Sequence, residues 1–221
     1  MAEEKERATP KSRIETLSDL IFGLALSIGA LTLIGAAPSS FEKLLLSLAY
    51  YAFSFLILIS VWYSYTRIMS DVRIETRRAV QLNILMLFLV SIEPFLFNEL
   101  NAPNLPTQYV SILYALDLGG LFMIQAALAN SILQEKDRPE KVIVHYKALR
   151  NAQIVGAAIF FVSMLPFFWT WMIPIGSGIS LRFIIWVGPI FTRFLRNFFE
   201  KREMAKHTGK KLKSEGGPDG N

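Results

Sequence analysis

The stretch LSDLIFGLALSIGALTLIGAA, residues 17–37, contains a single charged side chain, Asp19, and it decides the fold. A bilayer core about 30 Å thick is crossed by a helix of about 20 consecutive apolar residues. This stretch has that length. It is longer than the apolar region of a typical signal peptide, and Pro38 follows it directly. We therefore expect an uncleaved membrane-spanning helix close to the start of the chain.

Five further stretches are long and apolar enough to cross a bilayer. The six predicted spans cover residues 17–37, 44–65, 79–100, 108–133, 148–172 and 179–199. Short connections separate them, and Arg182, Gly188, Pro189 and Arg193 interrupt the last. The sequence thus predicts an all-α polytopic membrane protein with six transmembrane helices. Residues 1–16 form a predicted N-terminal segment, residues 17–200 the membrane domain, and residues 201–221 a basic tail expected to be disordered.

The positions of the basic residues predict the orientation of the chain. With six spans, every one of the 23 lysine and arginine residues except Lys43 and Arg182 falls on the same side of the membrane. Short connections rich in lysine and arginine remain in the cytoplasm. Both termini are therefore predicted to be cytoplasmic, and we expect a multi-pass protein of the plasma membrane surrounded by lipid.

Several classes of function are excluded by the composition. The chain is 52% hydrophobic and 19% charged, whereas a soluble domain carries about 25% charged residues. It has no cysteine, and its two histidines, His145 and His207, lie far apart in the sequence. We expect neither an enzyme nor a bound cofactor or structural metal. Nucleic-acid binding is not expected either, because the basic charge is explained by topology.

The first predicted helix has two distinct faces when its residues are placed at about 100° intervals. Bulky aliphatic side chains form one stripe, with Ser27 at its margin; the stripe comprises Leu17, Leu24, Ile28, Leu31 and Gly35. Small residues form the neighbouring stripe, which comprises Ser18, Ala25, Gly29 and Ala36. Small residues allow helices to approach closely in lipid, so we expect the second stripe to pack against the other helices.

The start of this helix resembles a known family. Arg13-x-x-x-Leu17-Ser18-Asp19 is similar to the Arg-x-x-x-Phe-Ser-Asp signature of the transmembrane protein 175 potassium-channel family. The similarity continues along the next three spans, in Ser54-Phe55 with Trp62, in Asn83 with Pro94-Phe95, and in Tyr114. Two departures are clear: Leu17 replaces the phenylalanine, and Tyr65-Thr66 stands where the family often has paired histidines. Proton sensitivity based on those imidazoles is therefore not carried over.

The resemblance implies a potassium-permeable channel without the carbonyl filter of pore-loop channels. It implies a homotetramer, in which the first helix of each six-span subunit lines one central pore, with permeant potassium as the bound ion. Leu24, Ile28 and Leu31 take the positions of the pore constriction, and Ser27 takes that of the pore threonine. These residues lie on or beside the aliphatic stripe.

The same resemblance implies a supporting polar network. Its members would be Arg13, Ser18 and Asp19 at the start of the first helix, with Trp62 and Asn83 as neighbours. The residues themselves leave a second interpretation open, in which Ser18 and Asp19 cap the helix and complement its dipole.

Two carboxylates deep in predicted spans support an alternative function. An ionised Glu93 or Asp117 in lipid costs roughly 2.5–3.5 kcal/mol on the insertion scale, so each needs a partner or a proton. Arg182 is a candidate partner for Glu93 or Glu99. The alternative to a channel is a proton-coupled or solute transporter that uses Asp117 and Glu93. A membrane scaffold is a third class, which the short connections disfavour.

Overall fold

The computed structural model describes residues 10–35, 40–72, 76–101, 106–135, 138–173, 179–188, 199 and 201–202. Five long helices dominate it: α1 (Pro10–Gly35), α2 (Phe41–Asp71), α3 (Arg77–Asn101), α4 (Thr107–Leu133) and α5 (Glu140–Val162). Two short helices follow, α6 (Phe167–Thr170) and α7 (Leu181–Val187). Between them, β1 (Met172–Ile173) pairs with β2 (Ile179–Ser180) in an antiparallel ribbon. The predicted all-α architecture is confirmed.

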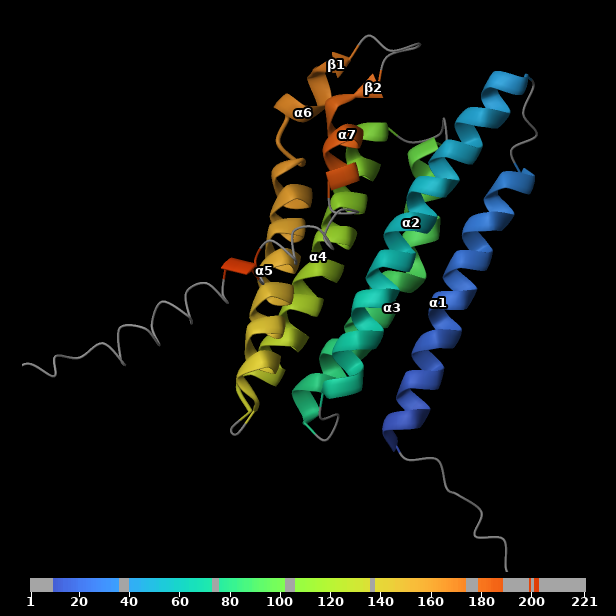
Figure 1. The fold of residues 1–221 in the computed structure, drawn as a ribbon. Coiled ribbons are helices and arrows are strands. Elements are labelled where there is room, and N and C mark those ends of the chain that lie inside the picture. Colours follow the sequence, from blue (N-terminus) through green and yellow to red (C-terminus); the bar gives the residue numbers. More distant parts are fainter. Residues whose placement is uncertain are drawn as a thin grey trace, which may run out of the picture.

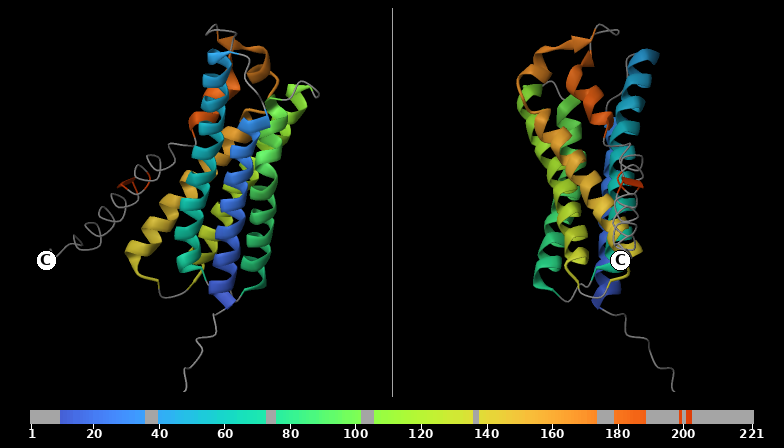
Figure 2. Two further views of the ribbon diagram at one scale, coloured as in Figure 1. Left: turned by 90° about the vertical axis from the view of Figure 1, so that its right-hand side faces the viewer. Right: turned by 60° about the vertical axis from the view of Figure 1, so that its left-hand side comes forward.

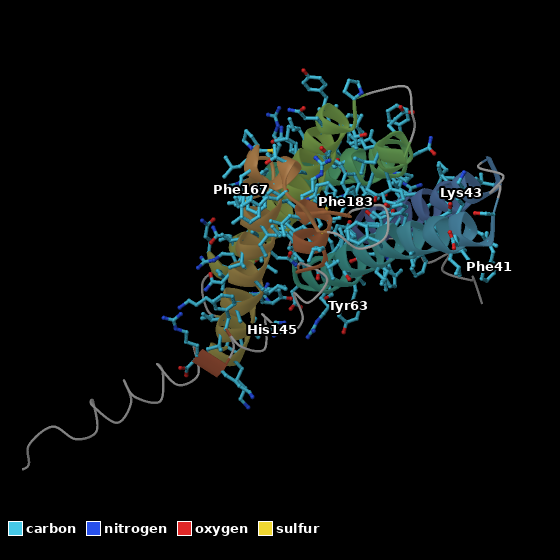
Figure 3. All side chains as sticks on the ribbon, turned by 90° about the horizontal axis from the view of Figure 1, so that it is seen from above. Phe41, Lys43, Tyr63, His145, Phe167 and Phe183 are labelled. Atoms are coloured by element: carbon cyan, nitrogen blue, oxygen red, sulfur yellow. The ribbon has the colours of Figure 1, made fainter. Side chains whose placement is uncertain are left out.

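The long helices run side by side as one bundle (Figure 1). Helix α4 packs against α2, α3 and α5, whereas α1 packs against α2 and α3 at one edge. Figure 2 shows α1 in front of its neighbours when this edge faces the viewer. Seen from above, Phe41 and Lys43 of α2 lie on the opposite side of the bundle from Phe167 of α6 (Figure 3). The edge that carries α1 is thus separate from the side formed by α5 and α6.

Four of the helices are long and apolar enough to cross a membrane, namely α1 to α4. Several helices of this length and composition are typical of a multi-pass membrane protein. Burial within the subunit differs strongly among them. In the apolar stretch of α4, 67% of the residues are buried, whereas in that of α1 only 17% are buried. Most of α1 therefore faces outward from its own subunit.

The fifth span differs from the prediction. Helix α5 begins at Glu140 rather than at residue 148, and it ends at Val162 instead of continuing to residue 172. Its first half contains Lys141, Lys147 and Arg150, which keeps it outside the set of clearly apolar helices. The early end precedes Pro166, which cannot continue the hydrogen-bond ladder of a helix.

Only the beginning of the predicted sixth span is described. Helix α7 covers Leu181–Val187, and residues 189–198 lie outside the described part of the chain. The connection between the fifth and sixth predicted spans includes residues 174–178, which lie outside it as well, as do all but two residues of the basic tail 201–221. The sidedness of the termini stays a prediction.

Glycines permit the close approach of α4 and α5. A Cβ atom added to Gly156 of α5 would lie 2.7 Å from the ring of Phe122 on α4. Phe122 is buried and packs against Phe160, with ring centroids 5.6 Å apart, so the ring has little room to move. The centre of the core therefore depends on a residue without a side chain at this point.

Candidate functional site

One face of α1 is buried against the rest of the bundle. The three described members of the small-residue stripe, Ser18, Ala25 and Gly29, are all buried. A Cβ atom added to Gly29 would lie 3.7 Å from the ring of Tyr51 on α2. Ala36, the fourth member, lies outside the described residues. The predicted packing face is therefore the observed one, and the small side chains on it let α1 approach its neighbours closely.

The other face of α1 is exposed and contains all four predicted pore residues. Leu24 is 58% exposed, Ile28 41% and Leu31 60%. Ser27 is exposed beside them, and its hydroxyl donates to the Gly23 carbonyl oxygen at 2.8 Å. A face that lines a pore between subunits must be exposed in a single subunit. A face that contacts lipid would be exposed in the same way. The assignment of Leu24, Ser27, Ile28 and Leu31 to the pore stays a prediction.

A buried hydrogen-bond chain joins α1 to α2 and α3. Tyr65 of α2 donates its phenolic proton to Asn83 Oδ1 on α3 at 2.6 Å. The Ser18 and Tyr65 hydroxyls lie 2.6 Å apart and share a hydrogen bond, and the Ser18 hydroxyl also lies 2.8 Å from the Ile14 carbonyl oxygen. Phe22 of α1 packs on the Tyr65 ring, with centroids 5.6 Å apart. These contacts fix the depth and rotation of α1.

A second hydrogen bond between side chains connects α1 to α2. Trp62 of α2 donates its indole proton to Asp19 Oδ1 on α1 at 2.9 Å. Four of the five predicted network residues thus make hydrogen bonds between helices. The fifth, Arg13, is exposed and makes no hydrogen bond or ion pair within the described part of the chain.

The alternative interpretation, in which Ser18 and Asp19 cap the first helix, is wrong. Helix α1 begins at Pro10, and both residues lie more than two turns inside it.

The sequence model of the family described as "Endosomal/lysosomal potassium channel TMEM175" matches residues 13–94, which run from the start of the Arg13 signature to Pro94 of α3. The predicted resemblance to this family is confirmed over these residues. Among curated proteins, none matches the chain.

A solved structure of a TMEM175 homologue has the same fold. It is the lysosomal potassium-selective channel TMEM175 homologue from Chamaesiphon minutus, which is 19% identical to this chain. The two superpose with a TM-score of 0.55 over 87% of this chain and 97% of the other. The shared fold therefore extends beyond the residues that the TMEM175 sequence model matches.

Tyr65 is the network residue that sequence reasoning missed. It was noted only as a departure at a position where the TMEM175 family often has a histidine, yet it links Ser18 to Asn83. A signal was present in the sequence, since Tyr65 follows Trp62 by three residues and therefore lies on the same side of α2. A phenol can replace an imidazole here because both accept one hydrogen bond while donating another.

Glu93 and Asp117 are both buried in the core of the bundle, and they differ in their hydrogen bonds. Ser54 of α2 and Tyr114 of α4 both donate to Glu93 Oε1, at 2.9 and 3.0 Å. Asp117 is 3% exposed and neither of its oxygens has a hydrogen-bond partner among the described residues. Ser54 and Tyr114 are both residues through which the sequence resembled the family, although their link to Glu93 was not foreseen.

Arg182 does not pair with either proposed carboxylate. Its guanidinium donates to the Ser111 hydroxyl on α4, and it lies 5.9 Å from the centroid of the Trp186 ring. No ion pair joins it to Glu93 or Glu99, all three of which are described. The predicted pairing is wrong, because the Arg182 guanidinium is directed to the Ser111 hydroxyl of α4 and Glu93 takes its hydrogen bonds from Ser54 and Tyr114.

Proposed function

We propose that this chain is one subunit of a homotetrameric potassium channel of the plasma membrane, with α1 lining the pore. The observation that carries the proposal is the division of α1 into two faces. One face is buried and hydrogen-bonded to α2 and α3 through Ser18 and Asp19. The opposite face presents Leu24, Ile28 and Leu31 outward, where four subunits can enclose an axis. The description of the matched family and the name of the similar structure support a potassium channel.

The proposed constriction is formed by three rings of branched aliphatic side chains. Leu24 and Leu31 are seven residues apart, which places the rings along about 10 Å of the pore. A narrow apolar neck of this kind is poorly wetted and can gate by dewetting. Potassium sheds its hydration shell at a lower cost than sodium does. A tight neck therefore favours potassium without a carbonyl filter.

Ser27 is the polar group beside this neck. Its hydroxyl proton is directed to the Gly23 carbonyl oxygen, so the lone pairs of Oγ remain available on the exposed side of α1. Four such oxygens, one from each subunit, can replace part of the hydration shell of a cation. We propose that Ser27 makes the constriction passable for potassium, with both chain termini in the cytoplasm.

A cysteine at position 28 tests the pore assignment. The chain has no native cysteine, so Ile28→Cys introduces a single reactive thiol. We expect a charged, water-soluble thiol reagent to abolish most potassium flux through the reconstituted variant, because the modified side chains fill the neck. The measurement is potassium flux into liposomes before and after treatment.

The matched control is Ile154→Cys on α5. Ile154 is 44% exposed, close to the 41% of Ile28, and α5 does not border α1 in the bundle (Figure 1). We expect the reagent to leave its flux unchanged. Equal inhibition of both variants, or of neither, would contradict the assignment of Ile28 to the pore.

No described contact favours the transporter alternative. Transport through Glu93 and Asp117 requires water to reach these carboxylates, and both are buried in the core, with exposures of 0% and 3%. Their burial among α2, α3 and α4 of a single subunit therefore counts against the transporter alternative.

A further inference from the structure

One side of α5 carries basic residues in its first half and exposed apolar residues in its second half. This α5 stripe consists of Lys147, Arg150, Ile154, Ala158 and Val162. Steps of three and four residues place all five within an arc of about 120° on the helix surface. Ile154 and Val162 are 44% and 49% exposed, and Ala158 is exposed between them. Helix α5 lies on the side of the bundle away from α1 (Figure 1), so the α5 stripe is separate from the proposed pore.

The guanidinium of Arg150 is held in place where α5 contacts α4. Its Nη1 donates to Asn130 Oδ1 on α4 at 3.0 Å, while its Nε and Nη2 donate to Asn151 Oδ1 at 3.4 and 3.2 Å. These bonds use three of the five N–H groups of a guanidinium, which leaves two for a further acceptor. Both partners are neutral amides. Arg150 is therefore fixed in position while its positive charge is not compensated.

No carboxylate in the described part of the chain forms an ion pair with the two basic residues of the α5 stripe. Glu135, in the connection from α4 to α5, is paired with Arg138 at 2.6 Å. Lys147 is half-buried one turn before Arg150, on the same side of the helix. The α5 stripe thus combines two uncompensated positive charges with a row of exposed aliphatic side chains.

The two halves of the α5 stripe follow each other in the order of a membrane interface. Asn130, the partner of Arg150, is three residues before the end of the apolar helix α4 at Leu133. Arg150 thus lies close to one end of the bundle, where lipid headgroups meet the apolar core. Ile154 and Val162 lie about 6 Å and about 18 Å further along α5, toward the middle of the bundle. A molecule with an anionic head and an apolar tail matches this order.

We propose that the α5 stripe binds an anionic phospholipid of the predicted cytoplasmic leaflet. The phosphate lies on Lys147 and Arg150, and an acyl chain lies along the apolar half of the stripe. A guanidinium can donate two parallel hydrogen bonds to phosphate oxygens, and the Lys147 ammonium adds a second charge. The small side chain of Ala158 leaves room for the acyl chain. A zwitterionic lipid has no net charge and gains less from the two cations. The site binds lipid whether or not the chain conducts potassium.

Lipid titration of the purified full-length protein in detergent, followed by native mass spectrometry, tests the proposal. We expect phosphatidylglycerol to bind more tightly than phosphatidylcholine with the same acyl chains. Lys147→Met should lower the affinity for phosphatidylglycerol about fivefold, and K147M/R150M about 25-fold, because each basic residue near a membrane surface contributes a factor of about this size. The affinity for phosphatidylcholine should change little in both variants.

The matched control is Arg78→Met. Arg78 is an exposed cation near the start of α3, at the same end of the bundle and outside the α5 stripe (Figure 1). This variant should keep the affinity of the wild type for phosphatidylglycerol. Lys147 makes no hydrogen bond within the described residues, so Lys147→Met decides the test if the double variant does not fold.

Glycerol phosphate, which has the anionic head without acyl chains, distinguishes a lipid from a free anion. We expect it not to compete with phosphatidylglycerol. Effective competition would overturn the proposal, because a free anion would then be the occupant. Equal affinity of the wild type for the two lipids, or an equal loss of affinity in R78M and K147M, would overturn it as well.

Discussion

Alanine in place of Leu24, Ile28 or Leu31 is expected to raise potassium flux through the reconstituted protein severalfold and to lower its preference for potassium over sodium. Each substitution removes three carbon atoms from every subunit of the proposed tetramer, at side chains that are 41% to 60% exposed on α1. The neck becomes wider and more easily wetted, so ions pass with more of their hydration shell. Flux of each ion into liposomes measures both effects.

The exposure of these side chains makes the test interpretable. Because they contribute little to the core of the subunit, truncating them should leave folding intact, which thermal melting can verify. The control Ile154→Ala removes the same atoms from α5 and should change neither flux nor selectivity. Unchanged flux in all three α1 variants would remove the pore assignment.

Replacing Tyr65 by phenylalanine is expected to destabilise the subunit by roughly 1 to 2 kcal/mol, because Ser18 and Asn83 lose their common partner in the core. The aromatic contact with Phe22 remains, so the change isolates the hydroxyl group. Thermal melting of the purified protein in detergent measures the loss.

The control for Tyr65 is Tyr109→Phe. Tyr109 lies at the start of α4, is 64% exposed, and should lose its hydroxyl without effect. An equal melting temperature for wild type and Tyr65→Phe would show that the hydrogen-bond chain does not stabilise the position of α1.

Periodicity and small residues were sufficient to predict the orientation of α1. The stripe of Ser18, Ala25 and Gly29 marked the buried face, because close helix contacts in lipid require small side chains. The same pattern placed Leu24, Ile28 and Leu31 together on the other face. These features are local to one helix, and local patterns can be read from a sequence.

Features that depend on contacts between distant segments were not predicted. Tyr65 looked like the loss of a histidine, and only the packing of three helices shows that its hydroxyl joins Ser18 to Asn83. Arg182 was given a carboxylate partner on charge alone, whereas the arrangement of α7 and α4 gives it Ser111. The early end of α5 was missed because an apolar run continues past Pro166.

We propose that the protein alone forms a potassium-preferring pore lined by α1. The most direct measurement is potassium flux into liposomes that contain only the purified chain, with sodium replacing potassium in a parallel experiment. We predict potassium flux well above sodium flux, and its loss when Ile28→Cys is modified. Absence of flux for both ions, in protein shown to be folded and assembled, would contradict the channel account.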